Sequence, residues 1–179
     1  ADEAKYLAAR PQHIDAHKRL VDQAVKLFGT RPFDHYDFLI AMTDKLGGIG
    51  LEHHRSSENS VDPAFFTGWH THLSDRDLLS HEMNHSWDGK WRRPADQYVP
   101  NFNTPLQNSL LWVYEGQTQY FGQVLAARSG LTQTDLVKAT GIDRSTLADL
   151  VARMTTKGLL ERERRQRALV LAEVARAIG

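Results

Sequence analysis

The chain has 179 residues, enough for one medium domain or for a small domain with an appended module. Its composition is 41% apolar and 25% charged with a formal net charge of zero, which excludes a global electrostatic attraction to nucleic acid or to a membrane surface. There is no cysteine, which excludes disulfides, thiolate ligands and a cysteine nucleophile, and no apolar run approaches the length of about 20 residues that a membrane span needs.

Two unlike parts meet near residue 130. All nine histidines lie between His13 and His85, and every aromatic residue precedes Leu131. Residues 1–130 hold 13 Lys/Arg and 16 Asp/Glu, whereas residues 131–179 hold 9 and 6. Because Gly130 is typical of a helix end, we predict one domain over residues 1–130 and a second over residues 131–179.

The first part begins with a predicted helix over residues 14–28, with Ile14, Val21, Val25 and Phe28 on one face and Gly29 as a stop. The apolar run at residues 38–42 has the length of a strand. A glycine-rich turn at residues 45–51 then leads into a predicted edge strand.

Two further helices are predicted in the first part. Ser74 is placed to cap a helix over residues 75–87 that Gly89 stops, and Pro105 is placed at the first position of a helix that runs to residue 127. Trp87, Trp91 and Trp112 are expected in the core.

Residues 81–85 read H-E-M-N-H, which matches the pattern H-E-x-x-H. On a helix, His81 and His85 lie one turn apart on the same face, so both imidazoles can reach one ion. Glu82 lies beside that face, where it can take a proton from a metal-activated water. Two neutral imidazoles and one carboxylate suit a catalytic zinc ion with an open position, although solvated side chains on a helix surface are the competing interpretation.

Glu115 is the candidate for the third ligand. It is the one carboxylate in the apolar run at residues 110–118, and a buried carboxylate needs a cation or a metal ion to compensate for its lost hydration. A core ion pair with Arg92 or Arg93 is the alternative. Asn84 and Gln119 are expected to steady the ligands, because Gln119 lies one turn beyond Glu115.

Three runs resemble the glycyl aminopeptidase family of PDZ-containing gluzincin metallopeptidases: G-L-E-H at 50–53, H-E-M-N-H-S-W-D-G-K-W-R-R-P at 81–94 and L-W-V-Y-E-G-Q-T at 111–118. The resemblance covers about residues 10–130. It implies an α+β fold with a thermolysin-like core, mostly helical with a small edge sheet. It also implies that His81, His85 and Glu115 bind one zinc ion and that Glu82 is the catalytic base.

The same resemblance implies that Gly50, Leu51 and Glu52 border the substrate cleft, with Glu52 holding the α-amino group of a peptide. An exposed charge at a strand end is the alternative for Glu52. Peptidases of this kind use an additional Tyr or His donor from beyond the third ligand, and no residue after Leu131 is of either type. An incomplete cleft therefore remains an alternative.

The second part has the spacing of a helix-turn-helix, with capped helices predicted over residues 132–140 and 145–156. Residues 141–147 and 153–162 resemble the winged-helix regulators of the multiple-antibiotic-resistance type (MarR). That resemblance implies a winged-helix module in which Ser145, Thr146 and Arg153 contact duplex DNA. The run at 161–167 lacks the turn residues of a wing, so a plain amphipathic tail is the alternative.

Together these patterns predict a zinc aminopeptidase that releases small N-terminal residues such as Gly or Ala, with peptides as substrates and no membrane partner. The alternatives are a DNA-binding regulator whose first part senses a metal or a peptide, and a metal-binding but inactive remnant. A genuine DNA-binding module predicts a cytoplasmic protein; otherwise the cytoplasm and the periplasm are both expected. The chain begins at Ala1 rather than Met, which favours an excised or processed piece, and a fusion of two unrelated parts is a further interpretation.

Overall fold

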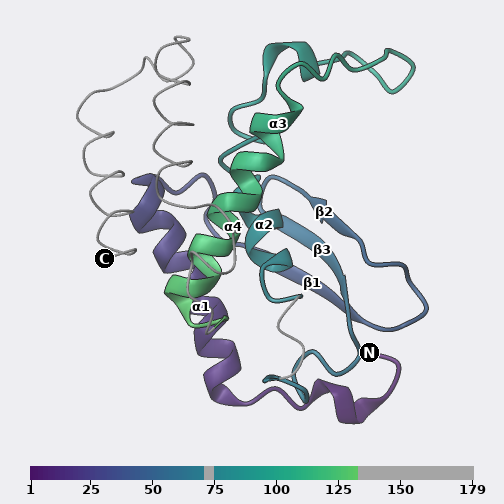
Figure 1. The fold of residues 1–179 in the computed structure, drawn as a ribbon, viewed down its shortest axis with the longest axis vertical. Helices are drawn as coiled ribbons and strands as arrows, with labels where there is room; N and C mark the ends of the chain where they lie inside the picture. Colours follow the sequence, from purple (N-terminus) through teal and green to yellow (C-terminus); the bar gives the residue numbers. More distant parts are fainter. Residues whose placement is uncertain (71–74, 133–179) are drawn as a thin grey trace. The chain divides into compact units, whose positions relative to one another are not determined.

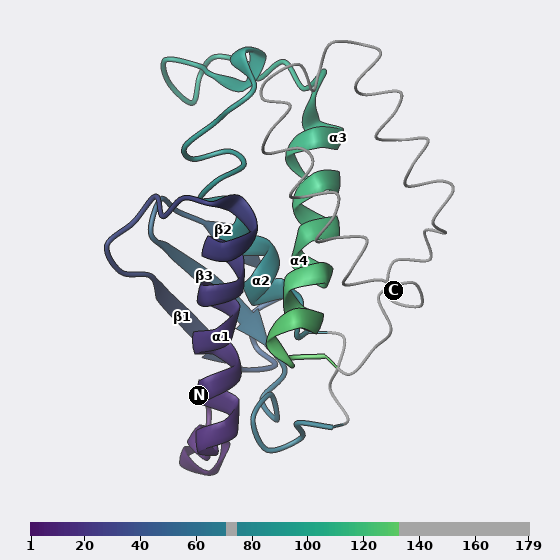
Figure 2. The ribbon, with the colours of Figure 1, turned by 90° about the vertical axis from the view of Figure 1, so that its left-hand side faces the viewer.

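The computed structural model describes residues 1–70 and 75–132, and residues 1–132 form one compact unit of α+β architecture. In the described ranges a small sheet is covered on one side by helices (Figures 1 and 2). None of the helices in these ranges is both long enough and apolar enough to cross a membrane. The predicted module at 131–179 lies almost entirely outside the described residues.

Helix α1 (Pro11–Phe28) follows a short 3-10 helix, η1 (Ala4–Leu7). Proline at its first position needs no hydrogen-bond donor there, and Gly29 ends the helix in the left-handed region with φ 69°. The buried stripe is His13, Ala16, Leu20, Ala24 and Leu27. The predicted helix is therefore present, but its buried face is shifted from the predicted one, and Ile14 is exposed.

The sheet has the strand order β1–β3–β2. Strand β1 (Asp37–Met42) runs parallel to β3 (Ser56–Val61), and β2 (Gly50–Glu52) pairs antiparallel with β3. The edge strand β2 and the strand β1 agree with the sequence analysis, whereas β3 was not predicted because its residues are mostly polar. Asn59 explains how a polar strand is buried, since its amide donates to Leu39 O at 3.3 Å and to Ser57 O at 3.2 Å.

Helix α2 (Leu78–Asn84) packs against β2, β3 and α4 (Gly116–Ser129), so it lies between the sheet and the long helix (Figures 1 and 2). It begins and ends inside the predicted range of 75–87. Ser74, the predicted cap, lies outside the described residues. Beneath α2, the apolar core of the unit contains Met42, Val61, Phe65, Phe66 and Leu79.

The predicted helix over 105–127 is wrong in its first third. A 3-10 helix, η2 (Ala95–Gln97), comes before it, helix α3 (Leu111–Tyr114) begins six residues after Pro105, and α4 follows after a break at Glu115. Asp96 holds the preceding segment in a non-helical path, because its carboxylate accepts from the Ser109 N–H at 3.1 Å and its carbonyl accepts from the Gln107 N–H at 3.1 Å.

The three tryptophans that were expected in the core differ in their burial. Trp87 is buried, and its indole N–H donates to Thr30 O at 3.1 Å. Trp91 and Trp112 are 55% and 47% exposed, so the expectation that they belong to the core is wrong. Apolar character alone does not bury a side chain, because a folded surface always retains apolar atoms.

Candidate active site

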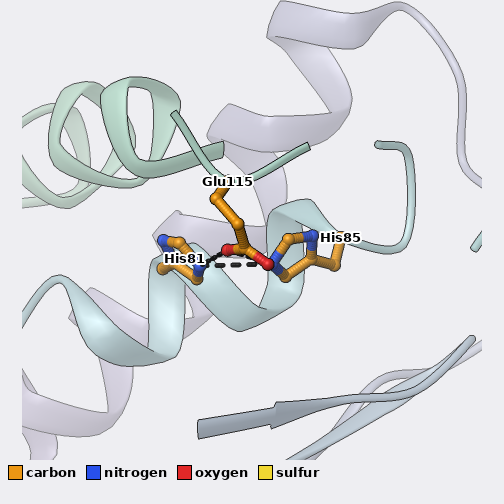
Figure 3. Close-up of side chains that lie close together, drawn as sticks. All are labelled: His81, His85 and Glu115. Carbon is orange, nitrogen blue, oxygen red and sulfur yellow. Dashed lines mark hydrogen bonds and ion pairs between the residues drawn. The ribbon is translucent and has the colours of Figure 1, made fainter. Parts of the chain in front are cut away.

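Helix α2 carries His81, and His85 lies directly after its last residue, at its C-terminal cap. Glu115 comes from the junction between α3 and α4, and Figure 3 shows its carboxylate facing the two imidazoles. The Nε2 atoms of His81 and His85 lie 3.1 Å apart, and Oε2 of Glu115 lies 3.2 Å from the first and 3.5 Å from the second. The structure therefore brings together the three side chains that the sequence analysis selected as ligands.

The hydrogen bonds of the far ring nitrogens assign the tautomers. Nδ1 of His85 lies 3.0 Å from the backbone carbonyl of Asp88, which can only accept, so Nδ1 carries the proton. Nδ1 of His81 lies 2.9 Å from Oε1 of Gln119, and the amide of Gln119 is oriented by donating through Nε2 to the Asp77 carboxylate at 2.9 Å. Nδ1 of His81 therefore carries its proton as well.

In its neutral form, each imidazole consequently presents a bare Nε2 lone pair to the same carboxylate oxygen. Three such acceptors repel one another unless a cation lies between them. Tetrahedral coordination with zinc–ligand bonds of about 2.05 Å places neighbouring ligand atoms about 3.4 Å apart. The observed separations of 3.1, 3.2 and 3.5 Å match that spacing, so the donor set fits a zinc ion.

Glu115 reaches this position differently from the sequence argument. The sequence predicted that the Glu115 carboxylate is buried in an apolar helix. The Glu115 side chain is instead 48% exposed and lies at a break between helices α3 and α4. Its carboxylate faces the two imidazoles rather than Arg92 or Arg93. The assumption of burial was wrong, although the choice of Glu115 as a neighbour of the histidines agrees with the structure.

Glu82 lies beside the group of ligands and is buried, with 5% of its surface exposed. Its carboxylate lies against the backbone of Gly50, where an added Cβ would come within 1.9 Å of Oε1. Burial, together with the carboxylates of Glu52 and Glu115, raises the pKa of Glu82 to about 8, while Lys90 opposes this rise. Gly50 is thus the residue that lets edge strand β2 approach Glu82.

Glu52, at the end of β2, has two partners that the sequence analysis did not identify. Tyr114 donates its hydroxyl to Oε1 of Glu52 at 2.5 Å, and Nζ of Lys90 lies 3.2 Å from the same oxygen. Burial alone would raise the pKa of Glu52, but the hydrogen bond from Tyr114 and the charge of Lys90 hold it below its usual value. Leu51 is exposed on the edge strand.

Tyr114 contacts both a proposed zinc ligand, His85, and the proposed ammonium-binding residue, Glu52. Its ring stacks on the imidazole of His85 with centroids 4.6 Å apart, and its hydroxyl reaches Glu52. Gly89, with φ 126°, makes room for this ring, because a Cβ there would come within 2.4 Å of it. The signals in the sequence were present but unspecific: Tyr114 directly precedes Glu115, and Lys90 lies in the run 81–94.

Two other expectations have different outcomes. Gln119 contacts His81 as anticipated, whereas the buried Asn84 side chain has no hydrogen-bond partner among the described residues. Ser145, Thr146 and Arg153, the predicted DNA contacts, lie outside the described residues, so DNA binding stays a prediction.

Comparison with known proteins found a family model and a solved structure that are both described as aminopeptidases. A family model described as M61 glycyl aminopeptidase matches residues 74–163, half of the chain. The crystal structure of an aminopeptidase N family protein from Idiomarina loihiensis is similar with a TM-score of 0.59 and 26% identity, over 74% of this chain and 22% of that one. The present chain thus spans under a quarter of the length of that structure. No curated protein matches the chain.

Proposed function

The chain belongs to the M61 glycyl aminopeptidase family, and from this premise we propose that it is a zinc-dependent peptidase that removes small N-terminal residues such as Gly or Ala. The family and the similar aminopeptidase structure support peptide hydrolysis. The proposal goes beyond peptide hydrolysis in three respects: zinc dependence, a thermolysin-like gluzincin catalytic core and a preference for small N-terminal residues.

The convergence of three lone pairs carries the proposal. His81, His85 and Glu115 are the residues that would hold the zinc ion, because their tautomers and spacing fit a cation between them. When bound, zinc acts as a Lewis acid that lowers the pKa of a coordinated water and polarises a carbonyl group.

Glu82 is proposed as the general base. It lies one residue after the first ligand, and a ring nitrogen of His85 and carboxylate oxygens of Glu52 and Glu82 all lie within 4.8 Å of one another. A carboxylate in this place can accept the proton of the attacking water and return it to the leaving amine. The approach of the Gly50 backbone fixes its position, so little reorganisation is needed.

Glu52 is proposed to bind the α-ammonium group of the peptide, which would make the enzyme trim N-termini. Edge strand β2, with Leu51 exposed, offers a border along which an extended peptide can lie. Lys90 and Tyr114 both contact Oε1 of Glu52, so the substrate ammonium can bind Oε2 beside Lys90 or replace the contact with Lys90.

The test combines metal analysis with kinetics on alanyl and glycyl p-nitroanilides. We expect one zinc ion per purified native chain, its loss in His85→Ala, and its retention in Glu82→Gln together with a fall in kcat of at least about a hundredfold. Glu58→Gln, at an exposed glutamate on β3, is the matched control and is expected to keep both zinc and turnover. Stoichiometric zinc with no turnover on either substrate would instead identify a metal-binding remnant and contradict the proposal.

A further inference from the structure

A hollow of about 420 Å³ opens beside the Glu52 end of the site. Among the described residues, its lining holds four basic side chains and one carboxylate: Arg31, Arg55, Lys90 and His54 line it together with Asp34, and Trp91 and Pro32 are among its apolar members. No catalytic step proposed above uses this hollow.

The hollow adjoins the site through two residues. Lys90 lines it, and the same ammonium group lies 3.2 Å from Oε1 of Glu52. Ser86 also lines it and directly follows the proposed ligand His85. A substrate whose ammonium group reaches Glu52 would therefore lie next to the opening.

Charge in the hollow is unbalanced. Lys90 is engaged by Glu52, but within residues 1–70 and 75–132 no carboxylate lies within 4.0 Å of the guanidinium group of Arg31 or Arg55. Asp34 supplies one negative charge against these cations. A guanidinium group pairs with a carboxylate through two parallel N–H donors, so the hollow is suited to that anion.

We propose that this hollow is a subsite for a carboxylate of the peptide substrate, an inference that rests on the proposed function. The carboxylate can come from an acidic side chain on the first residue or from the free C-terminus of a very short peptide. A carboxylate that draws Lys90 toward the hollow releases Glu52 for the substrate ammonium. Because Lys90 contacts Glu52 and also lines the hollow, binding of the substrate carboxylate in the hollow is coupled to binding of the substrate ammonium by Glu52.

Direct binding tests the subsite without requiring turnover. The full-length, zinc-loaded chain carrying Glu82→Gln is titrated by calorimetry with two matched pairs of probes: glutamyl amide against glutaminyl amide, and glycylglycine against glycylglycine amide. We expect the acidic member of at least one pair to bind about fivefold more tightly, the strength of a partly exposed ion pair, and the preference to shrink as salt is raised. Preference within the first pair assigns the side chain, and preference within the second assigns the C-terminus.

The double variant Arg31→Gln/Arg55→Gln, made in the same background, is expected to lose this preference. Lys18→Gln is the charge control, because Lys18 is exposed on α1 and does not line the hollow. Equal binding within both pairs, a preference that survives in the double variant, or no binding of any probe overturns the subsite. Hydrolysis of alanyl and glycyl p-nitroanilides, which carry no carboxylate, by the native chain tests the proposed function separately. A failure of the subsite can therefore be distinguished from a failure of the proposed peptidase function.

Discussion

At the scale of single residues, each proposed ligand histidine is oriented by the nitrogen that does not face the metal site. His85 uses the backbone carbonyl of Asp88, whereas His81 depends on a side-chain relay through Gln119 to Asp77. A carboxylate that orients an amide, which in turn orients an imidazole, fixes the tautomer of His81 as well as its direction. This relay can be removed without touching a ligand.

Replacing Gln119 by Leu is expected to weaken zinc binding about 10- to 100-fold, because His81 loses the acceptor that holds its Nε2 lone pair toward the ion. The measurement is competition for zinc against a chromophoric chelator. Gln117→Leu on the same helix is the control, since no hydrogen bond of that side chain is found among the described residues. Equal zinc affinities for the two variants would contradict the relay.

Gly50 matters for a steric reason. A Cβ at this position would come within 1.9 Å of Oε1 of Glu82, a distance that no packing tolerates, so the carboxylate has to move. We expect Gly50→Ala to lower kcat/KM about a hundredfold while zinc content stays at one per chain, because a displaced base is poorly aligned for proton transfer.

The control for this substitution is Gly47→Ala, where an added Cβ meets nothing within 4 Å. Kinetics on alanyl p-nitroanilide, with metal analysis of the same samples, provide the measurement. Full activity in Gly50→Ala would show that Glu82 is not confined by the edge strand.

At the scale of elements, the site is made by helix α2 lying between the sheet and α4. Gly122 allows the close approach of the two helices, because a Cβ there would lie 3.1 Å from the Cα of His81. The break at Glu115 then turns that side chain toward α2. Helix α1 also packs on α4, and His13 and His17 of α1 contact the rings of Phe66 and Trp69. The lowered pKa values of these two histidines give their packing a dependence on pH.

The contribution of His13 and His17 to the free energy of unfolding is expected to fall as the pH drops through about 6.5, while the raised pKa of Glu82 acts in the opposite direction. Burial, with Arg76 and Arg10 nearby, lowers the pKa of His13, which stacks on Trp69 at 4.0 Å, and burial also lowers the pKa of His17. Because these pKa values are lower in the folded state, the unfolded chain binds protons more readily in that range. The contribution of the neutral His13 and His17 side chains to stability is fully present above about pH 6.5 and is lost progressively as the pH falls below that value.

Urea denaturation followed by circular dichroism, in chelator so that zinc release plays no part, measures this dependence. His17→Phe is expected to raise the free energy of unfolding at about pH 5.5 relative to that at about pH 7.5, since it removes one of the two groups. The same change in unfolding free energy between these two pH values in His17→Phe and in the parent chain would contradict the prediction.

At the scale of the whole molecule, the proposed metal ion joins parts of the chain that are distant in sequence. His81 lies on α2 and His85 at its C-terminal cap, and Glu115 follows thirty residues after His85, beyond the segment that contains η2. A ligand that binds only the folded state stabilises it in proportion to the logarithm of its concentration. Zinc should therefore contribute to stability as well as to catalysis.

Chelation is expected to lower the melting temperature of the native chain by about 10 °C if free zinc had exceeded its Kd about a thousandfold. Differential scanning calorimetry with and without EDTA gives the shift. His85→Ala should melt at the same temperature in both conditions, whereas His35→Ala, at an exposed histidine, should keep the native shift. A native melting temperature that ignores EDTA would contradict a structural contribution of the metal.

The sequence by itself determined the parts of this protein that depend on local spacing. Two histidines four residues apart on a helix must share a face, and an apolar stripe followed by Gly29 favours a helix such as α1, so these features could be read from neighbouring residues, although the buried stripe of α1 is shifted from the predicted one. The run 111–118 pointed to Glu115 by its lone carboxylate, although for a reason of burial that does not hold.

Only the tertiary structure decided the rest, because it depends on contacts between distant residues. Polar strand β3 has no local apolar signal and is buried by the hydrogen bonds of Asn59. The start of α3 is set by Asp96, and the partners of Glu52 come from Tyr114 and Lys90, more than thirty residues away along the chain. Pairing across such separations is chosen by packing, which no pattern of neighbouring residues encodes.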